Sequence, residues 1–111
     1  MSRFSIRKMK TTLFFTFAFL LCTLVARAQG QAEATYKMKC VACHAADGTG
    51  SEVGKKLGTH DFHSSQVQGE SDADLTQIVA KGKNKMPAYE KVLKPDEVKG
   101  LVAYVRELGK K

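Results

Sequence analysis

Two cysteines and a histidine that could bind a cofactor lie together in the run Cys40-Val41-Ala42-Cys43-His44. Two thiols separated by two residues and followed at once by an imidazole form the CxxCH pattern, which is typical of covalent haem attachment. The thiols can add to the two vinyl groups of haem, and the histidine can bind the iron from the same side. The spacing therefore predicts a haem site at this point of the chain.

A methionine followed by a proline, Met86-Pro87, is the candidate for a second axial ligand, and it lies in a polar, lysine-rich stretch. Pro87 fixes its own φ and restricts the preceding residue to extended backbone, which would hold Met86 in place. Thioether sulfur binds haem iron and raises its reduction potential relative to a harder ligand. About 42 residues after a CxxCH and between two predicted helices, this pair favours iron ligation.

Three further residues have side chains that can bind iron, namely Met38, His60 and His63. Met38 is too close to Cys40 to reach the opposite face of the haem, so ordinary packing is the better interpretation. The two histidines lie in an irregular stretch with little helical character, which favours surface or capping roles. None of the three is predicted to be a ligand.

The first 28 residues have the three parts of a secretory signal peptide. Basic residues precede an uncharged, mainly apolar stretch at 11–25, and Ala26-Arg27-Ala28 forms an A-x-A cleavage site. An apolar run of about 15 residues is short for a membrane span, which needs roughly 20. We therefore expect cleavage after Ala28, which leaves residues 29–111 as the mature domain without a stable membrane span. The basic residues that precede the apolar stretch are Arg3, Arg7, Lys8 and Lys10.

Removal of the signal peptide changes the charge of the protein. Five of the 18 basic residues lie within residues 1–28, whereas all 11 acidic residues follow them, so the mature charge is near +2 and not +7. Two haem propionates would bring this charge closer to neutral. The basic composition therefore belongs largely to the export signal and gives no case for nucleic-acid binding.

Three segments are predicted to be helices. The first, residues 31–39, contains no glycine or proline, and we expect Tyr36 to pack on another helix. The second, residues 71–81, has Ser71 as a candidate N-cap and apolar residues at helical spacing. The third, residues 95–108, begins with a proline in its first turn and has a continuous apolar face.

The segments between these helices are predicted to be loops. Four glycines lie within residues 45–58, and glycines at this density are typical of turns. Residues 59–70 look irregular, with Phe62 as an anchor in the core. No segment alternates between apolar and polar residues as a strand does, so the expected fold class is all-α.

The combination of a CxxCH, a glycine-rich loop, a capped helix, a loop Met-Pro and a terminal amphipathic helix resembles the class I monohaem cytochromes c. The resemblance covers nearly all of residues 31–108. It implies a small cytochrome c fold, with three main helices and loops wrapped around one haem. It implies that Cys40 and Cys43 hold haem c covalently. It also implies that His44 is the proximal iron ligand and Met86 the distal one.

The chain departs from the family after the haem site, where the common pattern Gly-Pro-x-Leu is replaced by Gly54-Lys55-Lys56-Leu57. In the family, the proline carbonyl accepts a hydrogen bond from Nδ1–H of the ligand histidine. The Lys55 carbonyl can accept the same bond, because the contact uses backbone. We therefore predict a hydrogen bond from His44 Nδ1–H to the Lys55 carbonyl.

The expected function is that of an exported one-electron carrier and not an enzyme, acting either alone or as a subunit of a larger oxidoreductase. Its location would be periplasmic if the source is a Gram-negative bacterium. Iron with both axial positions filled by protein has no open site for a substrate. The partners are redox proteins whose identity the sequence does not give. Four lysines either form a basic rim that steers acidic docking sites or are simply solvated: Lys83, Lys85, Lys91 and Lys94.

Two other functions stay open at this point. In a haem sensor or catalyst, Met86 would detach and free the iron, and the reduced protein would then bind carbon monoxide readily. In a haem-free thiol–disulfide protein, Cys40 and Cys43 would form the redox pair, although the βαβ context expected for such a motif is missing. A pyridine haemochrome spectrum distinguishes a c-type haem protein from a haem-free thiol–disulfide protein.

Overall fold

The computed structural model describes the backbone of residues 2–111 and the side chains of residues 13–24 and 26–111. The basic side chains predicted to begin the signal peptide therefore lie outside the described residues. The chain divides into two compact units, Met1–Gly30 and Gln31–Lys111.

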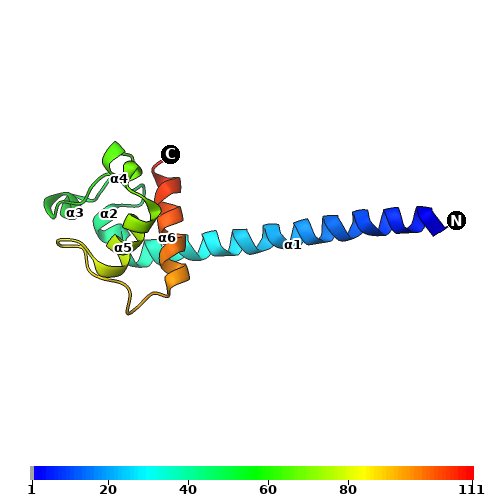
Figure 1. Cartoon of the computed structure of the whole chain (residues 1–111). Coiled ribbons are helices and arrows are strands. Elements are labelled where there is room, and N and C mark those ends of the chain that lie inside the picture. The colour runs from blue at the N-terminus through cyan, green and yellow to red at the C-terminus, as the bar shows by residue number, and fades with distance from the viewer. Residues whose placement is uncertain (1) are drawn as a thin grey trace. The chain divides into compact units, whose positions relative to one another are not determined.

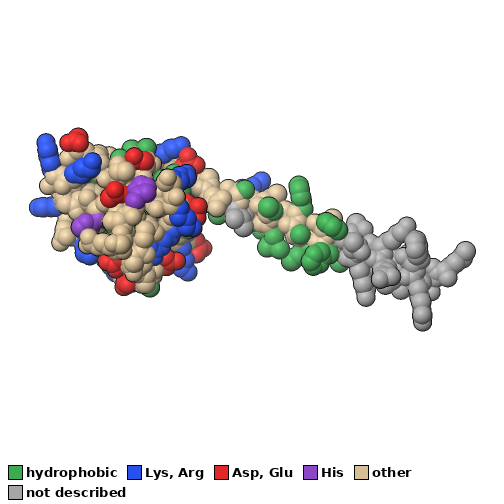
Figure 2. Space-filling view, turned by 90° about the horizontal axis from the view of Figure 1, so that it is seen from above, with side chains coloured by type: hydrophobic (Ala, Val, Ile, Leu, Met, Phe, Trp, Pro, Cys, Tyr) green, Lys and Arg blue, Asp and Glu red, His purple; other side chains and the backbone are tan. Residues whose placement is uncertain are grey.

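The N-terminal unit consists of the first part of helix α1 (Ser2–Lys39), which continues into the second unit. Its apolar side chains are exposed, as Figure 2 shows for the cluster on this helix, and Phe14 and Phe19 are 75% and 76% exposed. The stretch Leu13–Lys39 is long and apolar enough to cross a membrane, a test that an N-terminal signal sequence also passes. The helix does not break at the predicted cleavage site, because the one glycine nearby, Gly30, lowers helix propensity without ending a helix.

The C-terminal unit is built from the end of α1 and five further helices (Figure 1). The described residues form no strand, and their one β-bridge is an isolated pair, so the fold class is all-α as predicted. The helices are α2 (Val41–His44), α3 (Glu52–Lys56), α4 (Ser65–Gly69), α5 (Asp72–Lys81) and α6 (Pro95–Leu108).

The prediction of loops throughout residues 45–70 was wrong in two places, since α3 and α4 lie there. Each of these short helices begins at a serine N-cap. The Ser51 hydroxyl accepts a hydrogen bond from the Gly54 amide at 3.0 Å, and the Ser64 hydroxyl accepts one from the Val67 amide at 3.3 Å. A serine cap satisfies an amide that would otherwise lack a partner, which offsets the poor helix propensity of these sequences.

The two longer helices of this unit end where the sequence predicts. The Ser71 hydroxyl caps α5 by accepting from the Asp74 amide at 3.0 Å, and Gly82 ends the helix with a φ of 76°. Helix α6 has the predicted bounds, and its first turn is closed by a bond from the Lys94 amide to the Glu97 carboxylate at 2.7 Å.

The core forms where the end of α1 meets α6. Tyr36 is 2% exposed, and its ring lies 5.2 Å from the ring of Tyr104, which confirms its predicted packing. A side chain at Gly100 would meet Ala32 at 3.6 Å, so the two helices approach closely at this point. The buried apolar cluster comprises Tyr36, Phe62, Val67, Leu75, Leu93, Val98, Leu101, Val102 and Leu108.

Arg106 ties α6 to the end of α4 and to the start of α5. Its Nε donates to the Asp72 carboxylate at 2.9 Å, and one terminal nitrogen donates to the carbonyls of Val67 and Gln68, both at 3.2 Å. These carbonyls belong to the end of α4, where they have few partners within the helix. The guanidinium therefore fixes the position of α4 beside the core.

Candidate haem site

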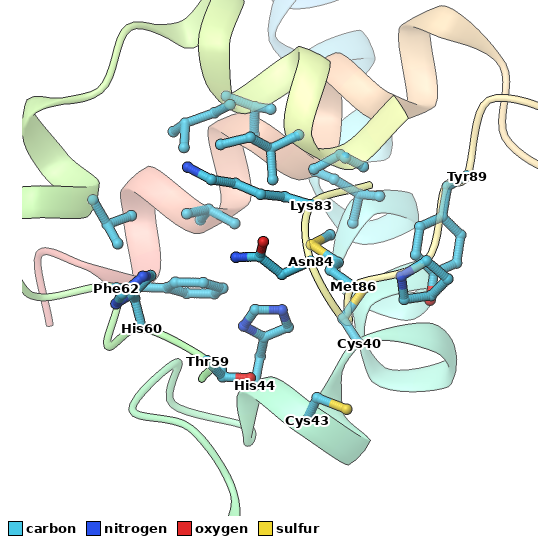
Figure 3. Close-up of a pocket in the computed structure, with 18 of the residues that line it drawn as sticks. Cys40, Cys43, His44, Thr59, His60, Phe62, Lys83, Asn84, Met86 and Tyr89 are labelled. Atoms are coloured by element: carbon cyan, nitrogen blue, oxygen red, sulfur yellow. The ribbon is translucent and has the colours of Figure 1, made fainter. Parts of the chain in front are cut away.

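A cavity of about 250 Å³ lies in the C-terminal unit and is lined mainly by apolar side chains (Figure 3). The four residues predicted to bind haem, Cys40, Cys43, His44 and Met86, all line it. Cys40 lies at the N-cap of α2 and the next two lie within α2, whereas Met86 comes from the loop after α5. Segments that are far apart in the sequence thus line the same cavity.

Helix α2 positions the cysteines and the histidine. The amide of His44 donates to the Cys40 carbonyl at 2.9 Å, which sets the imidazole one turn beyond the first thiol. The helix ends at Ala45, whose φ of 61° is uncommon for a residue other than glycine. The Tyr36 hydroxyl donates to the Ala45 carbonyl at 2.7 Å, and burial raises the pKa of this phenol, so it stays a donor.

Gly54 allows α3 to pack directly on α2. A Cβ atom at this position would lie 1.8 Å from the Cys43 carbonyl oxygen, which is far inside van der Waals contact. Two hydrogen bonds join the same surfaces, from the Ser51 amide to the Cys43 carbonyl at 2.9 Å and from the Ser51 hydroxyl to the Ala42 carbonyl at 2.7 Å. The carbonyls at the end of α2 are therefore satisfied by α3.

The imidazole of His44 projects toward the cavity, and its Nδ1 is buried with no hydrogen-bond partner among the described residues (Figure 3). The predicted bond from Nδ1 to the Lys55 carbonyl is thus not formed, and that carbonyl accepts from the Gly58 amide at 3.1 Å. Instead, the Phe62 ring stacks on the imidazole, with centroids 4.8 Å apart and planes at 28°. Burial lowers the pKa of His44, which favours the neutral form that binds metals.

The two thiols are not joined in a disulfide. Both cysteines are half-buried at the edge of the cavity, and burial raises the pKa of Cys40. A raised pKa disfavours the free thiolate of Cys40.

The loop that presents Met86 is fixed by its own backbone. The Lys83 amide donates to the Met86 carbonyl at 3.2 Å, and the Met86 amide donates to the Lys83 carbonyl at 2.9 Å. Asn84, inside this turn, has a φ of 54°. A Cβ at Gly82 would lie 2.5 Å from the Met86 carbonyl oxygen, so glycine is required both for its φ of 76° and for space.

Tyr89 anchors the far end of this loop. Its amide donates to the carbonyls of Val79 and Ala80 at 3.1 Å, which fastens the loop to the end of α5. Its hydroxyl donates to the Lys39 carbonyl at 3.1 Å, at the end of α1. The side chain also lines the cavity, so it links the methionine loop to the segment that leads into the CxxCH (Figure 3).

The remaining candidate ligands lie as follows. Met38 is 76% exposed, so the interpretation that it packs in the interior was wrong. His63 is on the surface and its Nδ1 lies 2.6 Å from the Asp61 carboxylate, as expected for a surface or capping role. His60 is exposed but lines the mouth of the cavity, which the sequence did not indicate (Figure 3).

The residues around the cavity fit haem c in their chemistry. Two thiols suit thioether formation, an imidazole and a thioether are known axial ligands, and an apolar lining suits a macrocycle whose faces avoid water. Sequence reasoning missed the stacking of Phe62 on His44 and the close approach at Gly54. Neither has a local signal, because both are contacts between segments that are distant in the sequence.

Comparisons with known proteins agree with this chemistry. The family described as cytochrome c oxidase, cbb3-type, subunit III matches residues 27–105. A cytochrome c6 of Nostoc sp. strain PCC 7120 is 34% identical over 96 residues, which are 86% of this chain and 82% of that protein. A cytochrome c6 of Bryopsis maxima is 38% identical over 66 residues, which are 60% and 75% respectively. The solved structure of the KustC0563 c-type cytochrome superposes with a TM-score of 0.66 at 30% identity, covering 69% of this chain and 95% of that chain.

Proposed function

Because this chain belongs to the cytochrome c family, we propose that it is an exported one-electron carrier in which His44 and Met86 bind the iron of its haem. Members of this family hold haem c covalently, and this chain has one such group. We assign its two thioether bonds to Cys40 and Cys43. The donor and acceptor are redox proteins, as they are for electron carriers in general.

The observation that carries the proposal is that an imidazole and a thioether line the same apolar cavity from two separate segments. His44 comes from a helix that is packed against α3, and Met86 comes from a turn closed by two backbone hydrogen bonds. Two ligands held by different parts of the fold can bind one iron from opposite sides. Such an arrangement leaves no open position for a substrate, which favours electron transfer over catalysis.

Haem c supplies a one-electron iron couple when it is bound. The residues of the chain tune and insulate that couple. Leu75, Leu101 and Val102 are nearly fully buried beside the cavity and exclude water from it. Because a low local dielectric disfavours the more highly charged iron state, this apolar wrap and the thioether of Met86 both act to raise the reduction potential.

Export depends on the N-terminal unit. We propose that residues 1–28 are a signal peptide that is cleaved after Ala28, so that the mature domain is residues 29–111. The proposal is supported by the exposed apolar side chains of residues 13–24 and by the compact unit that begins at Gln31. Mass spectrometry of the exported protein should find Gln29 at the N-terminus. Retention of residues 1–28 would show instead that this segment is a membrane anchor.

The decisive test is expression in a host that attaches c-type haem, followed by a pyridine haemochrome spectrum. We expect one c-type haem per chain, and none after Cys40→Ser together with Cys43→Ser. The reduced wild-type protein should bind carbon monoxide poorly, because Met86 fills the sixth position. Rapid binding of carbon monoxide by the wild type would favour a sensor or catalyst over an electron carrier.

A further inference from the structure

We propose that Gln29 becomes a pyroglutamate in the exported protein, so that the mature chain begins with a lactam and not with a free amine. The inference rests on the proposed cleavage after Ala28, because only that cut makes Gln29 the first residue of the chain. Glutamine can cyclise on its own nitrogen only at an N-terminus, since elsewhere that nitrogen is a peptide nitrogen whose lone pair is delocalised. The modification site is separate from the candidate haem site.

The reaction balances within the residue itself. The neutral α-amino nitrogen of Gln29 attacks its own side-chain Cδ, and the bond from Cδ to Nε2 breaks. Nε2 leaves as ammonia and carries away the proton that the attacking amine gives up. An ordinary α-amino group has a pKa of about 8, so part of it is neutral near neutral pH, and holding both reacting groups in one residue raises their effective concentration. No oxidant, reductant or second substrate is needed.

The two reacting groups are free to meet at this position. The second compact unit begins at Gln31, and the two residues before it, Gln29 and Gly30, are exposed. The Gln29 side chain has no hydrogen-bond partner among the residues that the structure describes. Nothing lies within 4 Å of the Cβ position of Gly30. Attack of the amine on the carboxamide therefore needs no rearrangement of the domain.

Cleavage itself releases the nitrogen that must react. Gln29 lies inside α1, and in an α-helix an amide donates to the carbonyl four residues earlier. That acceptor belongs to the segment that the cut removes, so Gln29 becomes an end residue of the helix with an unpaired nitrogen. Gly30 follows it, and glycine has the backbone freedom and the low helix propensity that let the terminal residue leave the helical conformation.

The neutral lactam suits its surroundings better than an ammonium group would. A positive charge is unfavourable at the N-terminus of a helix, and the nearest acid in α1, Glu33, already pairs with Lys37 at 2.6 Å. Gln31 donates to the Glu97 carboxylate at 3.2 Å, and this contact joins α1 to α6. A free amine two residues before Gln31 would compete for that carboxylate, whereas the lactam does not.

Closure of the terminus also protects the junction between the first and last helices. Aminopeptidases require a free α-amino group, and from Gln29 they would reach Gln31 after removing two residues. Loss of Gln31 would remove its bond to Glu97, and further trimming would approach Tyr36, which packs on Tyr104. The modification therefore gives an exported protein a stable start to the helix that leads into the CxxCH.

The test is intact mass and Edman sequencing of the holoprotein exported from a host that attaches c-type haem. We expect the mass of residues 29–111 with one haem, reduced by one ammonia, and no Edman signal. Pyroglutamate aminopeptidase should remove the block, after which sequencing should begin at Gly30. A broad-specificity aminopeptidase should leave the wild type intact.

Two variants separate the modification from the cut that precedes it. Gln29→Ala should be sequenced without prior removal of a block, and the broad-specificity aminopeptidase should shorten it. Gln31→Ala is the matched control, because it replaces the neighbouring exposed glutamine while Gln29 stays first. Gln31→Ala should therefore show the same loss of ammonia and the same blocked terminus as the wild type.

The outcomes distinguish failure of the modification from failure of the proposed function. A wild-type chain that begins with an unmodified Gln29 would overturn the cyclisation and leave the proposed export and cleavage standing. So would a block that persists in Gln29→Ala, because another group would then close the terminus. Retention of residues 1–28 would overturn the cleavage and the modification together. An exported chain with the lactam but without haem would confirm the modification and overturn the proposed electron carrier.

Discussion

The two sides of the candidate haem site are built in different ways. On the His44 side, the proposed ligand lies on a helix held by packing against α3, by the stacked ring of Phe62 and by a hydrogen bond from Tyr36. On the Met86 side, the proposed ligand lies in a short turn held by two backbone hydrogen bonds and by the conformation of Gly82. The first depends on the whole domain, whereas the second is a local structure.

This difference separates two properties of an electron carrier. Changes on the His44 side disturb contacts among α2, α3 and α6, so they should reduce folding stability and haem attachment together. Changes on the Met86 side disturb one turn, so they should alter the sixth ligand of the iron while the domain stays folded. The predictions that follow test this separation.

The largest effect is expected for Gly54→Ala. The new methyl group would lie 1.8 Å from the Cys43 carbonyl oxygen, so α3 must move away from α2. Overpacking typically costs about 1–3 kcal/mol, and because the clash here is with backbone we expect little holoprotein. Gly69→Ala is the control, because nothing lies within 4 Å of its Cβ position. Both variants are compared by their yield of haem-bearing protein and by urea unfolding. Equal yields would contradict the packing role of Gly54.

Met86→Ala should have the next largest effect, on the iron and not on the fold. Loss of the thioether opens the sixth position, so the reduced protein should bind carbon monoxide. Its reduction potential should fall by on the order of 0.1 V, a fraction of the roughly 0.8 V that axial ligands span. Met38→Ala is the control, since Met38 is 76% exposed. A Met86→Ala protein with an unchanged potential would remove Met86 from the ligand set.

Gly82→Ala should loosen the methionine turn. Both Gly82 and Gly58 have positive φ, at 76° and 86°, so alanine at either position costs about 1 kcal/mol or more. Only at Gly82 does the new methyl group also meet the Met86 carbonyl, at 2.5 Å. We therefore expect Gly82→Ala, unlike Gly58→Ala, to increase the rate of carbon monoxide binding. Equal rates of carbon monoxide binding in the two variants would show that the turn does not control the binding of Met86 to the iron.

The smallest effect concerns surface charge. Lys83 and Lys85 are exposed in the methionine turn, whereas Lys55 and Lys56 are exposed on α3. If the turn is the docking side, replacing Lys83 and Lys85 by Gln should lower the rate of oxidation by the anion ferricyanide and reduce its dependence on ionic strength. Replacing Lys55 and Lys56 by Gln should change both quantities less. If replacing Lys55 and Lys56 changed both quantities more than replacing Lys83 and Lys85, the cationic docking side would lie on α3.

The sequence predicted the parts of this molecule that have local signals. The bounds of α6 follow from a proline in the first turn and an apolar stripe, and α5 follows from its serine cap and the glycine after it. The site residues were proposed from a pentapeptide and a Met-Pro pair, both of which are contiguous. The fold class followed from the periodicity of three segments.

What the sequence did not predict has two causes, since some elements are too short to give a signal and some contacts join segments that are separated in the sequence. Helices α3 and α4 are too short to show periodicity, so only their serine caps could have indicated them. The bond from His44 to the Lys55 carbonyl was inferred by analogy with the family, and it is not formed, since His44 Nδ1 has no partner among the described residues. The stacking of Phe62 on His44 has no sequence signal, because it depends on how the loop after α2 folds back.

The contact between the first and last helices also constrains the order of events in the export that we propose for this chain. Gln31 donates to Glu97, 66 residues away, and Tyr36 packs on Tyr104 in the same junction. On the proposed export route, the domain therefore cannot close until nearly the whole chain has crossed the membrane. During that interval the two thiols to which we assign the haem would lie in an open chain, within reach of whatever attaches it, and closure afterwards would secure the finished cofactor.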